Sequence, residues 1–296
     1  MTRTRSWVLV LTVVLEAGRA ATAIATDEES GAPPLQQSLP TYLNDRGTGM
    51  PTTLFGTYIR AGELLIYPFY EYYNDQDREY KPSELGFDGE QDFRGRYRAH
   101  EGLLYLGYGL TEDLAVELEV AGIQASLEKS SEDLSAMPPR IEESGLGDID
   151  AHILWRMLRE TDGRPELFSF FKVAVPHQKD KVLIGTPGWE GDIGLGVVRG
   201  FRWGTLTLRA AAGFATGTES EFEIGEYAVE YLKRASAQWR VYAAVEGSGD
   251  EVSLITEVQW HLNPYVFLKM GTGIGLTSKA TDWEPEVGIL FTLPTR

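Results

Sequence analysis

The segment from Val252 to Leu262 reads VSLITEVQWHL and alternates apolar with polar side chains. One face carries Val252, Leu254, Val258, Trp260 and Leu262. The opposite face carries Ser253, Glu257, Gln259 and His261. Successive side chains of a β-strand point to opposite sides, so this segment is predicted to be a strand with one apolar and one polar face.

The same alternation recurs along the chain from residue 62 onward. The expected strands are 62–73, 97–108, 114–127, 146–158, 166–175, 192–200, 205–216, 226–233, 239–246, 252–262, 265–276 and 283–293. Most are about 8–13 residues long, close to the roughly 9–11 that a tilted strand needs to cross the hydrocarbon layer. Strands of ordinary globular proteins average nearer about five or six residues. The pattern therefore predicts about twelve membrane-crossing strands.

The links between these strands alternate between short and long. Tight turns are expected at 110–113, 201–204 and 263–264, where Gly, Pro, Asn or Asp occur. Longer links lie at 74–96, 128–145, 176–191 and 217–225. In a membrane barrel one rim carries turns and the other carries loops. This alternation predicts an antiparallel up-and-down barrel.

The apolar face is predicted to point outward to lipid. About twelve strands enclose a space too wide for side chains to fill, since roughly eight strands is the filled limit. The polar faces carry many ionisable groups, and aromatic residues gather near the strand ends of the apolar face, as in membrane barrels. These aromatic residues are Trp155, Tyr227, Tyr231, Trp239, Trp260 and Trp283. The expected fold class is an all-β transmembrane barrel.

One segment carries aromatic residues on both faces. In the strand expected at 166–175, Lys172 shares the polar face with Phe168 and Phe170. Either the lumen wall is partly apolar here, or this strand has a different register.

The N-terminal residues 1–23 have the pattern of a cleaved signal peptide. Arg3 and Arg5 precede the apolar run 7–15, and the small residues 21–23 follow as a cleavage site. The apolar run is too short for a membrane-spanning helix, which needs roughly 20 residues. This segment predicts export to the cell envelope, and a chain that then spans a membrane must do so as a closed barrel.

Residues 24–54 are rich in Pro, Gly and Ser. Such a segment can fold into the lumen as a plug or remain a disordered leader, and the sequence leaves both open. The barrel is then expected to comprise residues 55–296.

Composition excludes several classes of function. The net charge is −17, whereas nucleic-acid binding needs clustered Lys and Arg. The chain has no Cys, so disulfides, thiolate metal sites and Cys nucleophiles are excluded.

Three stretches resemble a family of outer-membrane proteins named for the meta-pathway of phenol degradation. They are Gly145-Leu146-Gly147-Asp148-Ile149-Asp150, Gly191-Asp192-Ile193-Gly194-Leu195-Gly196 and the closing strand 283–291, which reads WEPEVGILF. The resemblance covers most of the chain from about residue 50. It implies a Gram-negative outer-membrane barrel that transports small organic molecules.

The leading functional hypothesis is passive or facilitated passage of a small organic solute through the lumen. The lumen-lining candidates are Glu117, Glu119, Asp150, His152, Arg156, Lys172, Arg209, Glu230, Arg240, Glu257, His261, Lys269, Glu284 and Glu286. Their acidic excess is expected to favour cations or neutral polar solutes over anions. The alternative is that these charges pair across the lumen and brace a closed structural barrel.

An outer-membrane lipid hydrolase or protease is a further alternative. That chemistry needs a nucleophile beside a base, often His, and His177 in the link 176–191 has no Ser near it in sequence. Asp148, Asp150 and His152 share one strand face about 7 Å apart, so a single ion could engage two at most. The sequence predicts no catalytic residue, metal or cofactor. The expected partners are outer-membrane lipid, the solute, and the export and barrel-assembly machinery.

Overall fold

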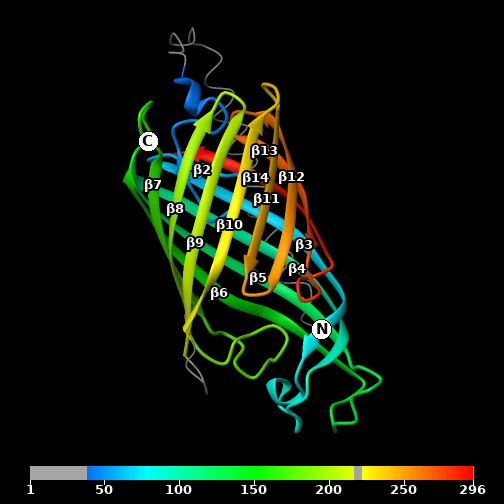
Figure 1. The fold of residues 1–296 in the computed structure, drawn as a ribbon. Helices are drawn as coiled ribbons and strands as arrows, with labels where there is room; N and C mark the ends of the chain where they lie inside the picture. The colour runs from blue at the N-terminus through cyan, green and yellow to red at the C-terminus, as the bar shows by residue number, and fades with distance from the viewer. Residues whose placement is uncertain (1–38, 217–221, 296) are drawn as a thin grey trace.

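The computed structural model describes residues 39–216 and 222–295. Across these residues, twelve antiparallel strands close into one barrel, in which each strand pairs with its neighbours in sequence and the last strand pairs with the first (Figure 1). The strands are β3 (Glu63–Tyr80), β4 (Phe93–Thr111), β5 (Leu114–Glu128), β6 (Arg140–Leu158), β7 (Glu166–Val175), β8 (Glu190–Phe201), β9 (Gly204–Ala215), β10 (Phe222–Arg234), β11 (Trp239–Ser248), β12 (Glu251–Asn263), β13 (Val266–Gly275) and β14 (Trp283–Pro294). The predicted all-β up-and-down barrel is confirmed.

Four short elements lie outside the barrel wall. They are the 3-10 turns η2 (Thr41–Leu43) and η3 (Pro82–Leu85) and the paired strands β1 (Met50–Pro51) and β2 (Tyr58–Ile59). None of the described residues forms a helix long and apolar enough to cross a membrane.

Three strands exceed their predicted lengths by six or seven residues. β3 has 18 residues, and β4 and β6 have 19 each. The additional residues of β3 read NDQDREY over 74–80, so both faces are polar and hydrophobic alternation stops. Backbone pairing with β4 nevertheless continues, with Asn74 opposite Arg98 and Tyr80 opposite Phe93. The ladder needs only backbone groups, so a strand can extend beyond the apolar layer.

The apolar side chains point outward. Ile193, Leu195 and Leu208 are among the large apolar residues exposed on the barrel exterior. Trp239 and Trp260 stack across neighbouring strands with their ring centroids 5.5 Å apart and are also exposed. An exterior of this kind is stable against lipid and unfavourable in water, which makes the barrel a transmembrane one.

The links at one end of the barrel, the turn rim, are mostly shorter than those at the other end, the loop rim. The turn rim carries links such as 112–113 and 202–203, while the loop rim carries the links 81–92, 129–139 and 176–189 (Figure 1). The start of β3 and the end of β14 both lie at the turn rim. The predicted alternation of short and long links therefore gives the barrel two unlike ends.

The register predicted for β7 also holds. Phe168 and Phe170 point into the barrel opposite Gly196 and Gly194 of β8. A Cβ at either glycine would overlap the facing phenyl ring. Glycine is required here because only a wall without side chains lets the two rings lie against it.

Candidate functional site

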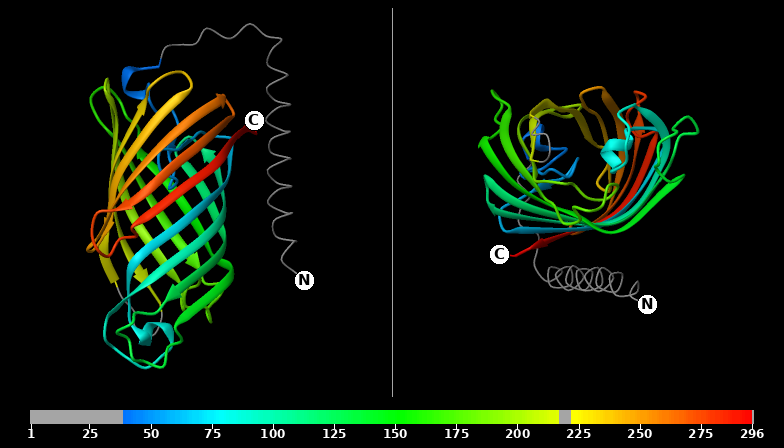
Figure 2. Two further views of the ribbon diagram at one scale, coloured as in Figure 1. Left: turned by 90° about the vertical axis from the view of Figure 1, so that its right-hand side faces the viewer. Right: turned by 90° about the horizontal axis from the view of Figure 1, so that it is seen from below.

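The lumen contains the chain segment that precedes the first barrel strand. Residues 39–62, here called the inner segment, begin with η2 at the turn rim and continue into the ring of strands (Figure 2). Its β1 and β2 form a short hairpin in which Met50 pairs with Ile59. Both side chains are almost fully buried and pack with Leu65, Tyr67 and Tyr105 of the wall. Residues 24–38 of the predicted plug-or-leader region lie outside the described residues, and the hairpin that follows η2 lies in the lumen.

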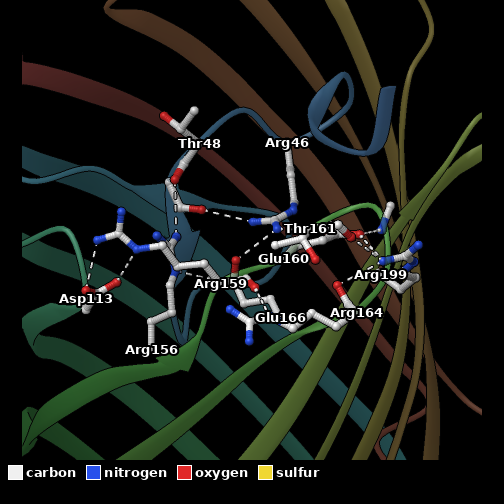
Figure 3. Close-up of polar contacts among 12 residues, drawn as sticks. Arg46, Thr48, Asp113, Arg156, Arg159, Glu160, Thr161, Arg164, Glu166 and Arg199 are labelled. Carbon is white, nitrogen blue, oxygen red and sulfur yellow. Dashed lines mark hydrogen bonds and ion pairs between the residues drawn. The ribbon is translucent and has the colours of Figure 1, made fainter. Parts of the chain in front are cut away.

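Buried ion pairs fasten the inner segment near the turn rim. Arg46 donates from Nη2 to Glu160 and to Glu166, at 2.9 Å each, and its side chain is 1% exposed (Figure 3). Arg156 of β6 lies 3.1 Å from Glu166 and donates to the Thr48 carbonyl at 3.2 Å. Carboxylates and guanidinium groups therefore neutralise one another where water is excluded.

The hairpin loop is held deeper in the lumen from several strands. The Thr53 amide donates to both oxygens of Glu117 at 3.3 and 3.2 Å, and its hydroxyl also donates to Glu117. Arg209 donates to the Thr52 carbonyl at 2.8 Å, and Lys269 donates to the Phe55 carbonyl at 3.1 Å.

A cavity of about 910 Å³ lies between this hairpin and the loop rim. Thr53, Leu54 and Phe55 of the inner segment line one end, and Leu183 and Ile184 of the β7–β8 link line the other. The acidic side chains lining the cavity are Glu71, Glu101, Glu119, Asp148, Asp150, Asp192, Glu226, Glu246, Glu251, Glu257, Glu284 and Glu286. The lining cations are Lys172, Arg209 and Lys269.

Each of these three cations has a carboxylate partner. Lys172 lies 3.1 Å from Asp150, Lys269 lies 3.0 Å from Glu257, and Arg209 pairs with Glu230. The remaining lining carboxylates exceed the available positive charge, so the cavity carries a negative surplus. Low-dielectric barrel walls concentrate such a field within the lumen.

Nine of the fourteen predicted lumen residues line this cavity. They are Glu119, Asp150, His152, Lys172, Arg209, Glu257, Lys269, Glu284 and Glu286.

The other five lie on the inner face away from the cavity lining. Glu117 and Arg156 bind the inner segment, and Glu230 binds Arg209. His261 stacks on Phe267 with ring centroids 4.5 Å apart, and Arg240 shares the inner face of β11 with Tyr242. Among the predicted residues, Glu117 and Arg156 thus bind the inner segment without lining the cavity, whereas Arg209 and Lys269 do both.

Local sequence patterns do not reveal several residues of this site. Arg46, Glu160 and Glu166 meet across 114 and 120 positions of sequence, which no local pattern reveals. Glu71 and Glu101, by contrast, fall on the polar faces of predicted strands, so the alternation alone places them in the lumen, and both line the cavity. The Asp148–Asp150–His152 row is divided: Asp148 binds the β7–β8 link, Asp150 pairs with Lys172, and His152 lies 3.5 Å from Glu117.

Solved structures similar to this chain include membrane barrels. The COG4313 outer membrane channel from Pseudomonas putida F1 has a TM-score of 0.58 and 15% identity, covering 79% of this chain and 97% of that chain. The translocator domain of the autotransporter NalP from Neisseria meningitidis has a TM-score of 0.49 and 8% identity, covering 95% and 96%. The toluene transporter TbuX from Ralstonia pickettii has a TM-score of 0.37 and 10% identity, covering 79% and 89%. No family model matches the sequence, and no curated protein matches it. At 15% identity, the similarity to the Pseudomonas channel shows a shared fold.

Proposed function

We propose that this protein is an outer-membrane channel through which small organic solutes pass, and that it is not an enzyme. The observation that carries the proposal is the cavity of about 910 Å³ inside a barrel whose exterior is apolar. Wall side chains fill the interior of a barrel of roughly eight strands, whereas twelve strands enclose a wider space. The inner segment fills that space only in part, and the cavity is what remains. The cavity is large enough for a small organic molecule, since ligand pockets are typically about 300–1,000 Å³.

The negative surplus of the lining gives the channel its selectivity. Rings of Asp and Glu favour cations in pores, and anions are repelled before they enter. The expected order of passage is small cations first, neutral polar molecules next and anions last. Phe69, Leu103 and Phe170 also line the cavity, so an apolar portion of an organic solute has a surface to contact.

The inner segment closes the pathway at the turn rim in this proposal. Its hairpin is bound by Glu117, Arg209 and Lys269 on separate strands. Passage then requires the hairpin to move aside while the barrel stays closed. The rival function is a permanently closed barrel, which the buried pairs of Arg46 with Glu160 and Glu166 favour.

Residues 1–23, outside the described residues, serve as the signal peptide, and the export and barrel-assembly machinery deliver the chain to outer-membrane lipid. We also propose that the chain is a member of the family named for the meta-pathway of phenol degradation and that its solute is an organic molecule.

Conductance measurements test it. The full chain after signal removal is placed in planar bilayers beside a variant lacking residues 39–54, and the reversal potential is recorded in a KCl gradient. We expect the deletion to raise conductance and the reversal potential to indicate cation preference. Heat-modifiable migration on a gel confirms that each protein is a folded barrel. If both folded proteins fail to conduct and give no liposome swelling with amino acids or aromatic amines, the channel function is excluded and the closed barrel stands.

A further inference from the structure

The link between β7 and β8, residues 176–189, lies across the loop-rim end of the cavity. Val182, Leu183 and Ile184 at its tip line the cavity. Ile184 is only 5% exposed and packs in a cluster with Ala99 and Ala125 of the wall. An apolar side chain buried from a polar loop indicates that the loop is folded inward onto the lumen.

A single carboxylate holds both ends of this link. Asp148 of β6 accepts a hydrogen bond at Oδ1 from the His177 amide at 2.7 Å. At Oδ2 it accepts the Thr186 amide at 2.8 Å and the Thr186 hydroxyl at 2.7 Å. The two bound residues lie on either side of the apolar tip, so Asp148 fixes the base of the loop.

A second carboxylate holds the tip. Glu143 of β6 accepts the Val182 amide at 3.2 Å and the Leu183 amide at 2.8 Å. Hydrogen bonds to a charged acceptor are stronger than those between neutral groups. Five hydrogen bonds thus hold residues 177–186 of the link to β6, while Thr216 binds its far end at Trp189.

A β-bulge in β6 explains how Glu143 and Asp148 can both face inward. They are five residues apart, and residues an odd number apart point to opposite faces of a regular strand. The pairing with β5 shifts register between Val120–Ile149 and Gly122–Leu146. The extra residue in β6 reverses the alternation, which turns Glu143 to the same side as Asp148.

Gly145, between the two carboxylates, provides space for the link. A Cβ there would lie 3.3 Å from Nε2 of Gln178 and 3.5 Å from Cδ1 of Ile184. A larger side chain would push the tip away from the wall. Gly145 and Asp148 of the glycine-rich motif thus both contact the link.

We propose that residues 176–189 form a lid over the loop-rim end of the cavity, and that Asp148 is the residue that positions it. The lid is held by a few hydrogen bonds and one buried apolar side chain, whereas the barrel wall is held by continuous ladders. Segments with few such contacts open locally without unfolding the remainder. Opening the lid exposes Ile184 and the acidic cavity beneath it, while the inner segment still closes the other end.

Thiol labelling tests the lid without relying on transport. The chain has no Cys, so Ile184→Cys introduces a single thiol on the buried side of the lid. Leu134→Cys is the matched control, because Leu134 lies in the loop-rim link 129–139 and is 93% exposed. Both purified barrels, in detergent, are treated with a maleimide carrying a polyethylene glycol chain, and the labelled fraction is read from the shift on a gel.

We expect Ile184→Cys to label at least about tenfold more slowly than Leu134→Cys, since the reagent must wait for local opening. Adding Asp148→Ala is expected to bring the rate at Ile184→Cys close to that of the control. Asp148→Asn, which keeps one acceptor oxygen, is expected to give an intermediate rate. Glu143→Gln serves as a second variant that loosens only the tip, and heat-modifiable migration verifies folding of each protein.

Equal labelling of Ile184→Cys and Leu134→Cys would overturn the lid, as would a slow rate that neither Asp148→Ala nor Glu143→Gln alters. The outcome is independent of the channel proposal. A barrel that never conducts can still show protected Ile184→Cys, and a conducting barrel can lack a lid.

Discussion

The guanidinium of Arg46 lies 2.9 Å from the carboxylate of Glu166, although the two residues are 120 positions apart in sequence. Both side chains are almost fully buried. This pair joins the inner segment to the wall of the barrel, so the charge that stabilises the lumen also determines whether the segment stays in place.

Replacing Arg46 with Ala is expected to release the inner segment. Glu160 and Glu166 would lose this cation and keep only Arg199 and Arg156. Breaking a buried ion pair typically costs about 3–5 kcal/mol, and the remaining cations lower that cost here. Conductance in planar bilayers should therefore rise toward that of the variant lacking residues 39–54. Arg60→Ala is the matched control, because Arg60 is in the same segment and its side chain is 59% exposed. Unchanged conductance in a folded Arg46→Ala barrel would show that this ion pair does not control closure.

Neutralising carboxylates of the cavity is expected to weaken its cation preference. Glu101 and Glu284 both line the cavity, and Glu101→Gln with Glu284→Gln removes two negative charges while keeping side-chain size. The reversal potential in a KCl gradient should move toward zero, because the field that favours cations is reduced. Glu132→Gln, in the exposed loop 129–139, should leave it unchanged. A reversal potential unaffected by the double variant would contradict selectivity by these carboxylates.

The contact between Gly194 and Phe170 is expected to be intolerant of a larger side chain. Gly194→Val places atoms where the Phe170 ring lies, and overpacking of this kind costs about 1–3 kcal/mol. The urea midpoint of unfolding should fall, and adding Phe170→Ala should recover part of the loss. Gly163→Ala is the control, since a Cβ at Gly163 meets nothing within 4 Å. If Gly194→Val and Gly163→Ala unfold at the same midpoint, the two strands do not pack as described.

An ion pair at the turn rim is expected to contribute stability that depends on pH. Arg159 donates to both carboxylate oxygens of Asp113 at 2.8 and 2.9 Å, and this lowers the pKa of the Asp113 carboxyl from its ordinary value. Because the folded pKa is depressed, the contribution is present above the unfolded pKa of about 3.9 and is lost as pH falls through the folded value.

Arg159→Ala should therefore unfold at a lower urea midpoint than the parent at pH 7, by no more than about 1 kcal/mol because the pair is half exposed to solvent. The difference should disappear at the most acidic pH at which the barrel stays folded. Asp113→Asn, in which nothing titrates at this position, supplies the comparison. A difference between Arg159→Ala and the parent that persists unchanged at low pH would assign the effect to packing of the Arg159 side chain instead.

The sequence by itself determined the barrel, because each strand carries its orientation in its own alternation. In the segment from Val252 to Leu262, the alternation alone indicates which side chains face lipid, without reference to any other strand. For the same reason the inward direction of Glu257, Lys269 and Glu284 could be predicted. The C-terminal end of β3 could not be predicted, because residues 74–80 are polar on both faces and only backbone pairing with β4 defines them.

The tertiary structure alone decided how the lumen is closed. Arg46 meets Glu160 and Glu166 only after the barrel has formed around the inner segment. Glu143 faces inward only because a bulge in β6 shifts its register, and Asp148 reaches His177 and Thr186 because the link folds back over the wall. Such contacts join residues distant along the chain, so no local period encodes them. Alternation therefore specifies the wall of this protein, while the plug, the lid and the cavity between them follow from contacts across it.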